Sequence, residues 1–93
     1  MAALTLDDFA GAVGARFEME AGEHRLPVEL TSASPLPPSD REGGSFRLEF
    51  LGPVDPAFMY GTFVFRRDGR ADEIYVTALG RDENGTRYEA VFF

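Results

Sequence analysis

Apolar residues recur at every second position in several short runs of this sequence, and turn-forming residues separate these runs. Phe17 and Met19 alternate with charged residues, and the same alternation returns at Leu26, Val28 and Leu30. A period of two is typical of β-strands with one buried face, whereas a helix has a period of about 3.6 residues. The pattern therefore predicts a chain built mainly of β-strands.

The second half of the chain has further segments of the same kind. They cover residues 46–50, 62–65, 73–79 and 87–93. Asp68-Gly69 and Asn84-Gly85 are dipeptides that favour the tight turns of β-hairpins. Together with the two earlier runs, these segments predict about six strands, most of them antiparallel neighbours.

Prolines and glycines indicate where strands end. Pro27 has no N–H to donate to a neighbouring strand, which predicts that its strand lies at a sheet edge. Residues 34–44 contain prolines and glycines without any periodicity, so we expect them to form the longest loop.

A short helix is predicted before the first strand. Thr5 stands in an N-cap position, and Asp8 follows it at the spacing of a capping box. The helix is expected to begin after this cap and to end at Gly14, a C-terminal glycine. Its apolar face would comprise Leu6, Phe9, Ala10 and Val13. A helix this short needs a surface to pack on, because it is not stable alone.

The C-terminal strands need cover on both faces. Ile74 and Val76 alternate with Tyr75 and Leu79, so the strand carries apolar side chains on opposite sides. We expect one side to face the other strands and the second to face the helix. The predicted fold is α+β and β-rich: one domain, residues 1–93, with a short N-terminal helix packed on a curved, mostly antiparallel sheet or small barrel of about six strands.

The charge of the chain excludes two classes of partner. A formal net charge of -7 repels the phosphates of nucleic acids and the surface of anionic membranes. There is no cysteine, so the chain has no disulfide or thiolate metal site. Asp7 and Asp8 stand where a signal peptide would be basic or apolar, so we expect a cytoplasmic location.

No pattern of residues indicates catalysis or metal binding. His24 is the one histidine and falls in a predicted turn, where it is interpreted as a solvated residue; a pH-sensing or general-base role stays open. Asp82 and Glu83 resemble a calcium loop only in part, because Gly80 stands where an oxygen ligand is required. The chain is therefore predicted not to be an enzyme and to bind no cofactor or metal.

Two groups of residues are candidates for a protein interface. Arg66, Arg67 and Arg70 surround a predicted hairpin turn, where guanidinium groups could bind an acidic patch of a partner; a solvated hairpin tip is the alternative. Aromatic residues and methionine are enriched in interfaces, although they are also common in cores. The apolar candidates are Phe58, Met59, Tyr60, Tyr75, Leu79, Val91 and Phe93. Phe93 is the candidate most expected to be exposed in a monomer. Val91 and Phe93 are expected to lie beside Tyr75 and Leu79 of the neighbouring strand if the register allows.

Three motifs resemble a family of small bacterial domains of unknown function. They are Leu4-Thr5-Leu6-Asp7-Asp8-Phe9, Pro35-Leu36-Pro37-Pro38 and Gly85-Thr86-Arg87-Tyr88-Glu89-Ala90-Val91-Phe92. The resemblance covers nearly the whole chain. It implies a fold but no catalytic or binding site, because the motif residues are those of caps, turns and strands. Some members of the family that the chain resembles occur near phage-tail-like genes, which implies a role in assembly.

Three functional hypotheses follow. The first is a non-catalytic protein-interaction or assembly domain that binds a protein partner or itself. The second is a small-molecule-binding barrel or enzyme, with a barrel mouth lined by Tyr60, Tyr75 or Tyr88 and anchored by Arg66 or Arg87. The third, implied by the resemblance, is a structural component of a phage-tail-like particle.

Overall fold

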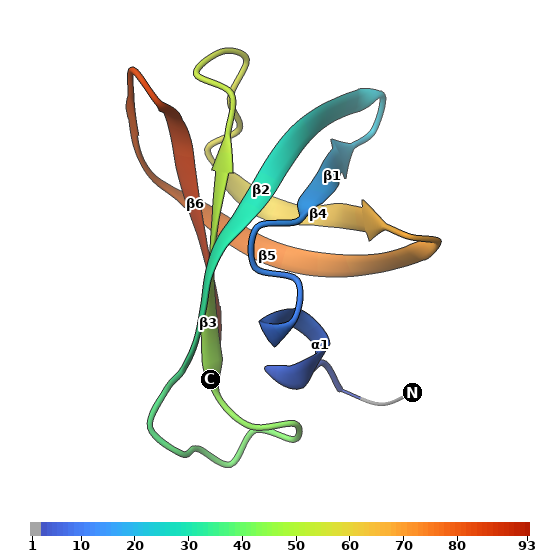
Figure 1. Ribbon diagram of the computed structural model, residues 1–93, viewed down its shortest axis with the longest axis vertical. Helices are drawn as coiled ribbons and strands as arrows, with labels where there is room; N and C mark the ends of the chain where they lie inside the picture. The colour runs from blue at the N-terminus through green and yellow to red at the C-terminus, as the bar shows by residue number, and fades with distance from the viewer. Residues whose placement is uncertain (1–2) are drawn as a thin grey trace.

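The computed structural model describes residues 3–93 as a closed barrel of six β-strands preceded by one helical turn (Figure 1). The elements in chain order are α1 (Asp7–Ala10), β1 (Arg16–Ala21), β2 (His24–Pro35), β3 (Phe46–Gly52), β4 (Tyr60–Arg67), β5 (Arg70–Asp82) and β6 (Gly85–Phe92). The predicted β-rich, antiparallel architecture of six strands is confirmed. Because the helical part is a single turn, the class is better described as β than as α+β.

Two three-stranded meanders make up the barrel. The strand order is β1-β2-β3-β6-β5-β4, and every neighbouring pair is antiparallel. β3 pairs with β6 and β1 pairs with β4, so these two contacts join the meanders and close the barrel. The period-two pattern of the sequence thus points one set of side chains into a common interior.

Side chains fill the barrel interior. Every strand contributes to the buried core, whose strand residues are Phe17, Met19, Leu26, Val28, Leu30, Phe46, Leu48, Phe50, Phe63, Phe65, Ile74, Val76, Tyr88 and Ala90. Aromatic rings pack against one another across it, with Phe50 lying between Phe17 at 5.7 Å and Phe65 at 4.7 Å between ring centroids. A small barrel packed in this way has no room for a ligand inside.

The prediction that the strand with Pro27 lies at a sheet edge is wrong, because β2 lies between β1 and β3 in a closed barrel. Pro27 nevertheless lies where β2 has no need of its N–H for a hydrogen bond to β3. It pairs with Glu18 of β1, while the ladder between β2 and β3 begins only at Glu29↔Leu51. The missing N–H therefore falls on a stretch of β2 that extends beyond the end of β3.

The predicted helix is shorter than expected and differently capped. α1 is a single turn with Leu6 at its N-cap, so Thr5 is not the N-cap. Val13 lies beyond α1 and is 49% exposed, whereas Ala12 is buried in its place. Because the chain leaves the helical conformation after Ala10, the predicted spacing of the apolar face does not apply. Residues 3–93 contain no helix that is long and apolar enough to cross a membrane.

α1 lies beside the end of the barrel where β3 begins (Figure 1) and does not cover the outer face of β5 and β6. Phe9 packs against Phe46 and Phe92, with ring centroids 6.0 and 6.5 Å apart. The Arg41 guanidinium lies over the Phe46 and Phe92 rings and donates a hydrogen bond to the Leu4 carbonyl oxygen. Arg41 thereby ties the long loop, residues 36–45, to the N-terminal segment.

The contact between the Asp8 carboxylate and Thr5, at the start of α1, predicts different effects for substitutions of these two residues. Asp8 Oδ2 accepts hydrogen bonds from the Thr5 N–H at 2.7 Å and the Thr5 hydroxyl at 3.3 Å. Asp8→Ala removes both and should lower the free energy of unfolding by about 1 kcal/mol, whereas Thr5→Ala keeps the main-chain bond and should cost less than about 0.5 kcal/mol. Urea denaturation at pH 7 measures both, and equal losses would contradict the assignment.

The same contact has a pH dependence. The Thr5 N–H lowers the pKa of Asp8 below its usual value, so the stabilisation exists above the pKa of the unfolded state and is lost as the pH falls through the lower folded value. The difference in stability between the wild type and Asp8→Ala, measured by urea denaturation, should therefore shrink as the pH falls below about 4, the ordinary pKa of an aspartate.

Gly85 is required where β3 and β6 approach each other. Its φ of +141° disfavours any side chain, and a Cβ there would collide with the Gly52 carbonyl oxygen. Gly85→Ala should therefore destabilise the barrel by more than about 2 kcal/mol. Gly80→Ala is the matched control, because a Cβ at Gly80 has no atom within 4 Å. Urea denaturation of the two variants compares them directly, and a stable Gly85→Ala would contradict this view of the contact.

Candidate protein-interaction surface

Four large apolar side chains are exposed on or beside the outer face of β4 and β5. Met59 is 75% exposed, Tyr60 66%, Tyr75 58% and Leu79 50%. We call these four residues the β4–β5 patch. The outer face of a small barrel meets water and is usually polar, so a cluster of this kind is unusual.

The register of the two strands brings the patch together. Tyr60 pairs with Thr77 and Thr62 pairs with Tyr75, so the two tyrosines occupy diagonal positions on the same outer face. The Ala78 N–H donates to the Met59 carbonyl oxygen at 2.6 Å and places Met59 beside the second half of β5. The sequence predicted each of the four as an interface residue, and the structure brings them to one surface.

An open groove of about 380 Å³ continues the patch. Its lining consists of Ala57, Phe58, Met59, Ala78, Leu79, Gly80, Arg81 and Thr86. Met59 and Leu79 belong to both the groove and the patch. The sequence predicted Phe58, Met59 and Leu79 as interface residues but none of the other residues that line the groove. The loss of alternation at Leu79-Gly80, a typical signal of a β-bulge, could have indicated this site.

The groove exists because β4 and β5 separate. Their ladder ends at Tyr60↔Thr77, whereas β5 continues to pair with β6 as far as Asp82↔Gly85. The register of β5 and β6 shifts between Ala78 and Gly80, which leaves Leu79 as the bulged residue. The loop before β4 turns away from β5, and the groove lies between them.

Phe58 forms a wall of the groove and is not a freely exposed interface residue. Its ring stacks on Phe63 with centroids 4.6 Å apart, and it is partly buried. Its N–H donates to the Tyr88 hydroxyl at 3.0 Å. The loop is therefore fixed to the barrel by a hydrogen bond to a core residue.

Two hydroxyl groups lie under the groove. Burial raises the pKa of Tyr88 above its usual value, while the hydrogen bond from the Phe58 N–H and the Thr86 hydroxyl act in the opposite direction. Thr86 is buried, and its Oγ1 makes no hydrogen bond of regular geometry to any of residues 3–93. The Tyr88 hydroxyl thus holds the Phe58 wall from inside the barrel, while Thr86 and Arg81 add polar side chains to a mainly apolar lining.

Val91 and Phe93 are exposed as the sequence predicted for Phe93, at 54% and 66%. They do not extend the β4–β5 patch, however. The ladder between β5 and β6 stops at Thr77↔Glu89, so Val91 lies beyond its end. Glu89 is ion-paired with Arg47, and this charged pair occupies the outer face beside Val91. The expectation that Val91 and Phe93 lie against Tyr75 and Leu79 is therefore wrong.

The predicted arginine cluster consists of paired side chains. Arg66 Nε lies 3.1 Å from Glu20 and Arg70 Nε lies 2.8 Å from Asp72. Arg67 lies 3.4 Å from Asp68 and also over the Phe17 ring. All three stand near the β4–β5 hairpin, at the opposite end of β5 from the groove. Their charge is largely compensated within the domain.

The residues of the alternative barrel-mouth site do not line one cavity. Tyr60 and Tyr75 lie on the outer face, Tyr88 is fully buried, Arg66 bonds to Glu20 and Arg87 bonds to Asp82. A second cleft of about 70 Å³ lies between α1 and the β4–β5 hairpin. Its lining is Asp8, Phe9, Phe17, Phe65, Arg67, Arg70 and Asp72.

Metal-binding residues are scattered. His24 is exposed at the start of β2. Within residues 3–93 there is no group of three histidine, cysteine or acidic side chains that could hold a metal ion. Asp82 instead accepts a hydrogen bond from the Asn84 N–H at 2.8 Å and pairs with Arg87, as expected for a hairpin turn.

Comparison with known proteins identifies the family. The family model described as "Domain of unknown function (DUF6916)" matches residues 4–92, so the chain belongs to this family. The predicted resemblance to a small domain of unknown function is confirmed; bacterial origin and a phage-gene context stay predictions. No curated protein and no solved structure matches the chain.

Replacing Tyr88 tests how the groove wall is held. Tyr88→Phe leaves the Phe58 N–H without its acceptor and should cost about 1–3 kcal/mol of stability at pH 7. It should also flatten the stability profile in alkali. The raised pKa of Tyr88 means that the unfolded chain loses its proton first, so wild-type stability should fall as the pH rises above about 10.

Chemical denaturation between pH 7 and 11 measures both effects. Tyr75→Phe, which removes the hydroxyl of an exposed tyrosine, is the control and should leave stability at pH 7 unchanged. A Tyr88→Phe variant as stable as wild type, with the same alkaline profile, would contradict the role of the hydrogen bond.

Proposed function

We propose that the domain is a non-catalytic protein-interaction or assembly module whose binding surface is the β4–β5 patch with its groove. The observation that carries this proposal is the group of four large apolar side chains, each at least half exposed, on one outer side of a barrel whose interior is already full. The isolated domain leaves at least half of each of these side chains in water, and burial in an interface is the expected use of such a group.

The composition of the patch suits a binding surface. Tyrosine and methionine are enriched in interface cores, and each tyrosine combines a large apolar ring with a hydroxyl that stays hydrated in the free protein. Burying such a side chain fully contributes on the order of 1.5–3 kcal/mol. Binding would bury the half to three quarters of each side chain that is still exposed, which favours these four residues as anchors of a complex.

The chemistry of the clefts favours binding over catalysis. In the smaller cleft Arg70 bonds to both Asp8 and Asp72, so its charged groups neutralise one another. The larger groove has Arg81 as its one charged lining residue, and the Arg81 guanidinium donates to the Val54 carbonyl oxygen at 3.3 Å. Neither cleft combines an activated nucleophile with a general base. The chemistry of these two clefts thus supports binding rather than catalysis.

A double substitution in the patch tests the proposal. Tyr60→Ser/Tyr75→Ser removes both rings from the outer face and should abolish capture of the partners that the wild-type domain retains from its cell lysate, with unchanged circular dichroism. Thr62→Ala/Thr77→Ala is the matched control, because these residues pair with the two tyrosines on the same face. Equal capture by wild type and both variants, or no capture at all together with a monomeric mass, would overturn the proposal.

Phe93→Ala compares the second exposed apolar site. Because the ring is 66% exposed, its loss should lower the stability of the monomer by less than about 1 kcal/mol. Native mass spectrometry of this variant separates the two surfaces. Partner capture that depends on Phe93 and not on the two tyrosines would place the interface at the end of β6 and contradict the patch.

A further inference from the structure

We propose that the groove receives an extended segment of a partner protein, which adds as a β-strand to the free edge of β5 beyond the end of β4. The segment has apolar residues at alternate positions and a positive net charge. This proposal rests on the proposed function and specifies how the partner binds.

The free edge arises from the unequal lengths of the strand ladders. β5 extends to Asp82, but its last pair with β4 is Tyr60↔Thr77, followed by the single hydrogen bond from Ala78 to Met59. From Leu79 to Asp82 it therefore pairs with β6 alone, and all four residues are exposed. The groove runs along this unpaired side, in the place that a longer β4 would occupy.

The hairpin turn determines which main-chain groups face the groove. Asp82 and Gly85 flank a two-residue turn, so they form the hydrogen-bonded pair that closes it. Paired residues in an antiparallel ladder alternate between bonded and non-bonded positions. The next pair, Arg81↔Thr86, is thus non-bonded, and the N–H and C=O of Arg81 point away from β6. A strand laid beside Arg81 can bond to both groups, as in other strand-addition complexes.

The lining of the groove selects the side chains of the added strand. Phe58, Met59, Ala78 and Leu79 present apolar surface beside the free edge. A strand sends every second side chain to the same face, so alternate residues of the added segment would enter the groove. A helix would not use the main-chain groups of Arg81. The combination of a free edge and an apolar groove therefore indicates an extended occupant.

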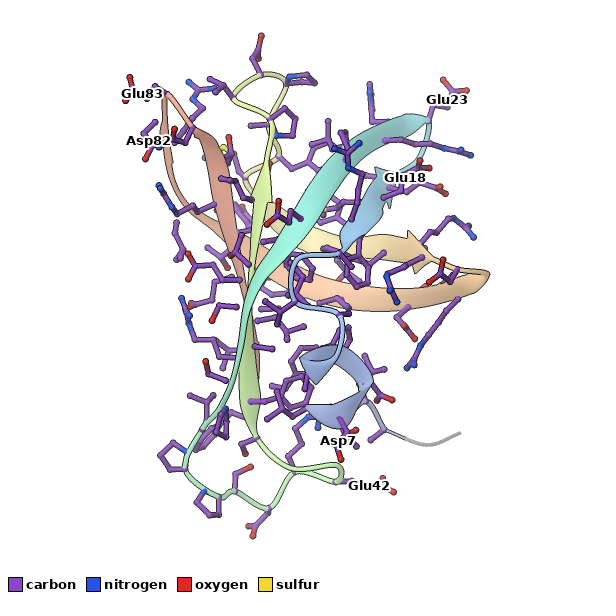
Figure 2. All side chains as sticks on the ribbon, viewed as in Figure 1. Asp7, Glu18, Glu23, Glu42, Asp82 and Glu83 are labelled. Carbon is purple, nitrogen blue, oxygen red and sulfur yellow. The ribbon has the colours of Figure 1, made fainter. Side chains whose placement is uncertain are left out.

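The charge of the surroundings selects a positive segment. The chain carries a net charge of -7, and neither Asp55 nor Glu83, which lie in the loop and the turn that border the groove, pairs with an arginine among residues 3–93. Figure 2 shows Asp82 and Glu83 at the tip of the β5–β6 turn. Arg81 is the one positive charge in the groove lining and points to the Val54 carbonyl oxygen, so the carboxylates of Asp55 and Glu83 outnumber it. Attraction to this end of the barrel therefore favours lysine or arginine beside the apolar residues.

A peptide titration tests the mode of binding without a cellular partner. The probe is the synthetic peptide acetyl-Lys-Val-Thr-Val-Lys-amide, added to the nitrogen-15-labelled domain and followed by NMR. We expect the largest amide shifts at Leu79, Gly80, Arg81 and Met59. Methylation of the peptide nitrogens should weaken binding at least about tenfold, because the main-chain hydrogen bonds are lost. The same peptide with glutamate for lysine should bind more weakly.

Two substitutions of one residue separate main chain from side chain. Arg81→Pro removes the N–H that the added strand would use, at a position where β6 does not need it, and should weaken peptide binding at least about tenfold. Arg81→Ala keeps the main chain and should bind the peptide with at most a two- to threefold change. If Arg81→Pro does not fold, the comparison of methylated and unmethylated peptides shows whether binding depends on main-chain hydrogen bonds.

Other outcomes overturn the proposal. Equal binding of methylated and unmethylated peptides excludes strand addition, as does the absence of shifts at any peptide concentration. Shifts confined to Tyr60 and Tyr75 would leave the interaction surface in place and exclude the edge. Shifts at the edge that grow with protein concentration in the absence of peptide would identify a second copy as the occupant. If the tyrosine variant loses partner capture but the wild-type domain does not bind the peptide, only the proposal of strand addition is refuted. If the domain binds the peptide but captures no partner, only the proposed function is refuted.

Discussion

The full interior of the barrel is the constraint on which the rest of this structure depends. Six strands enclose a volume that their inward side chains and Phe9 fill, with aromatic rings such as Phe50 packed against their neighbours. Closing the sheet satisfies most strand edges, and the packing holds the chain without disulfides. It also removes the usual place for a ligand. Any recognition by this domain has to use its outer faces and the ends of its strands.

β5 creates the candidate binding surface because it has two neighbours along different parts of its length. Its first part pairs with β4 and its last part with β6, and the overlap of the two ladders is short. The bulge at Leu79 lies where β5 stops pairing with β4 and continues to pair with β6 alone. The β4–β5 patch and the groove therefore lie side by side because the pairing of β5 changes between them. A β4 longer by a few residues would fill the groove and cover the edge.

The sequence predicts the local parts of this structure well and the non-local parts poorly. Alternation predicts that Phe46 lies on a buried face and that Ile74 and Tyr75 lie on opposite faces of one strand, because a side chain's face depends only on its position in the strand. The length of α1 and the position of Phe58 depend on contacts with distant residues, which no local pattern encodes. The separation of Val91 from the patch likewise depends on where the β5–β6 ladder ends. Register and bulges are set by tertiary packing.

In the proposed mode of binding, the charge of the domain would make the free edge of β5 selective. An unpaired strand edge beside apolar surface can pair with a second copy of the same chain, which leads to aggregation. Two copies each carrying a charge of -7 repel one another, and Asp55 and Glu83 bring this repulsion close to the edge. The same charge attracts a basic segment. One electrostatic property thus disfavours self-pairing and favours a partner of opposite sign, so the edge can remain exposed in the free domain without the cover of a longer β4.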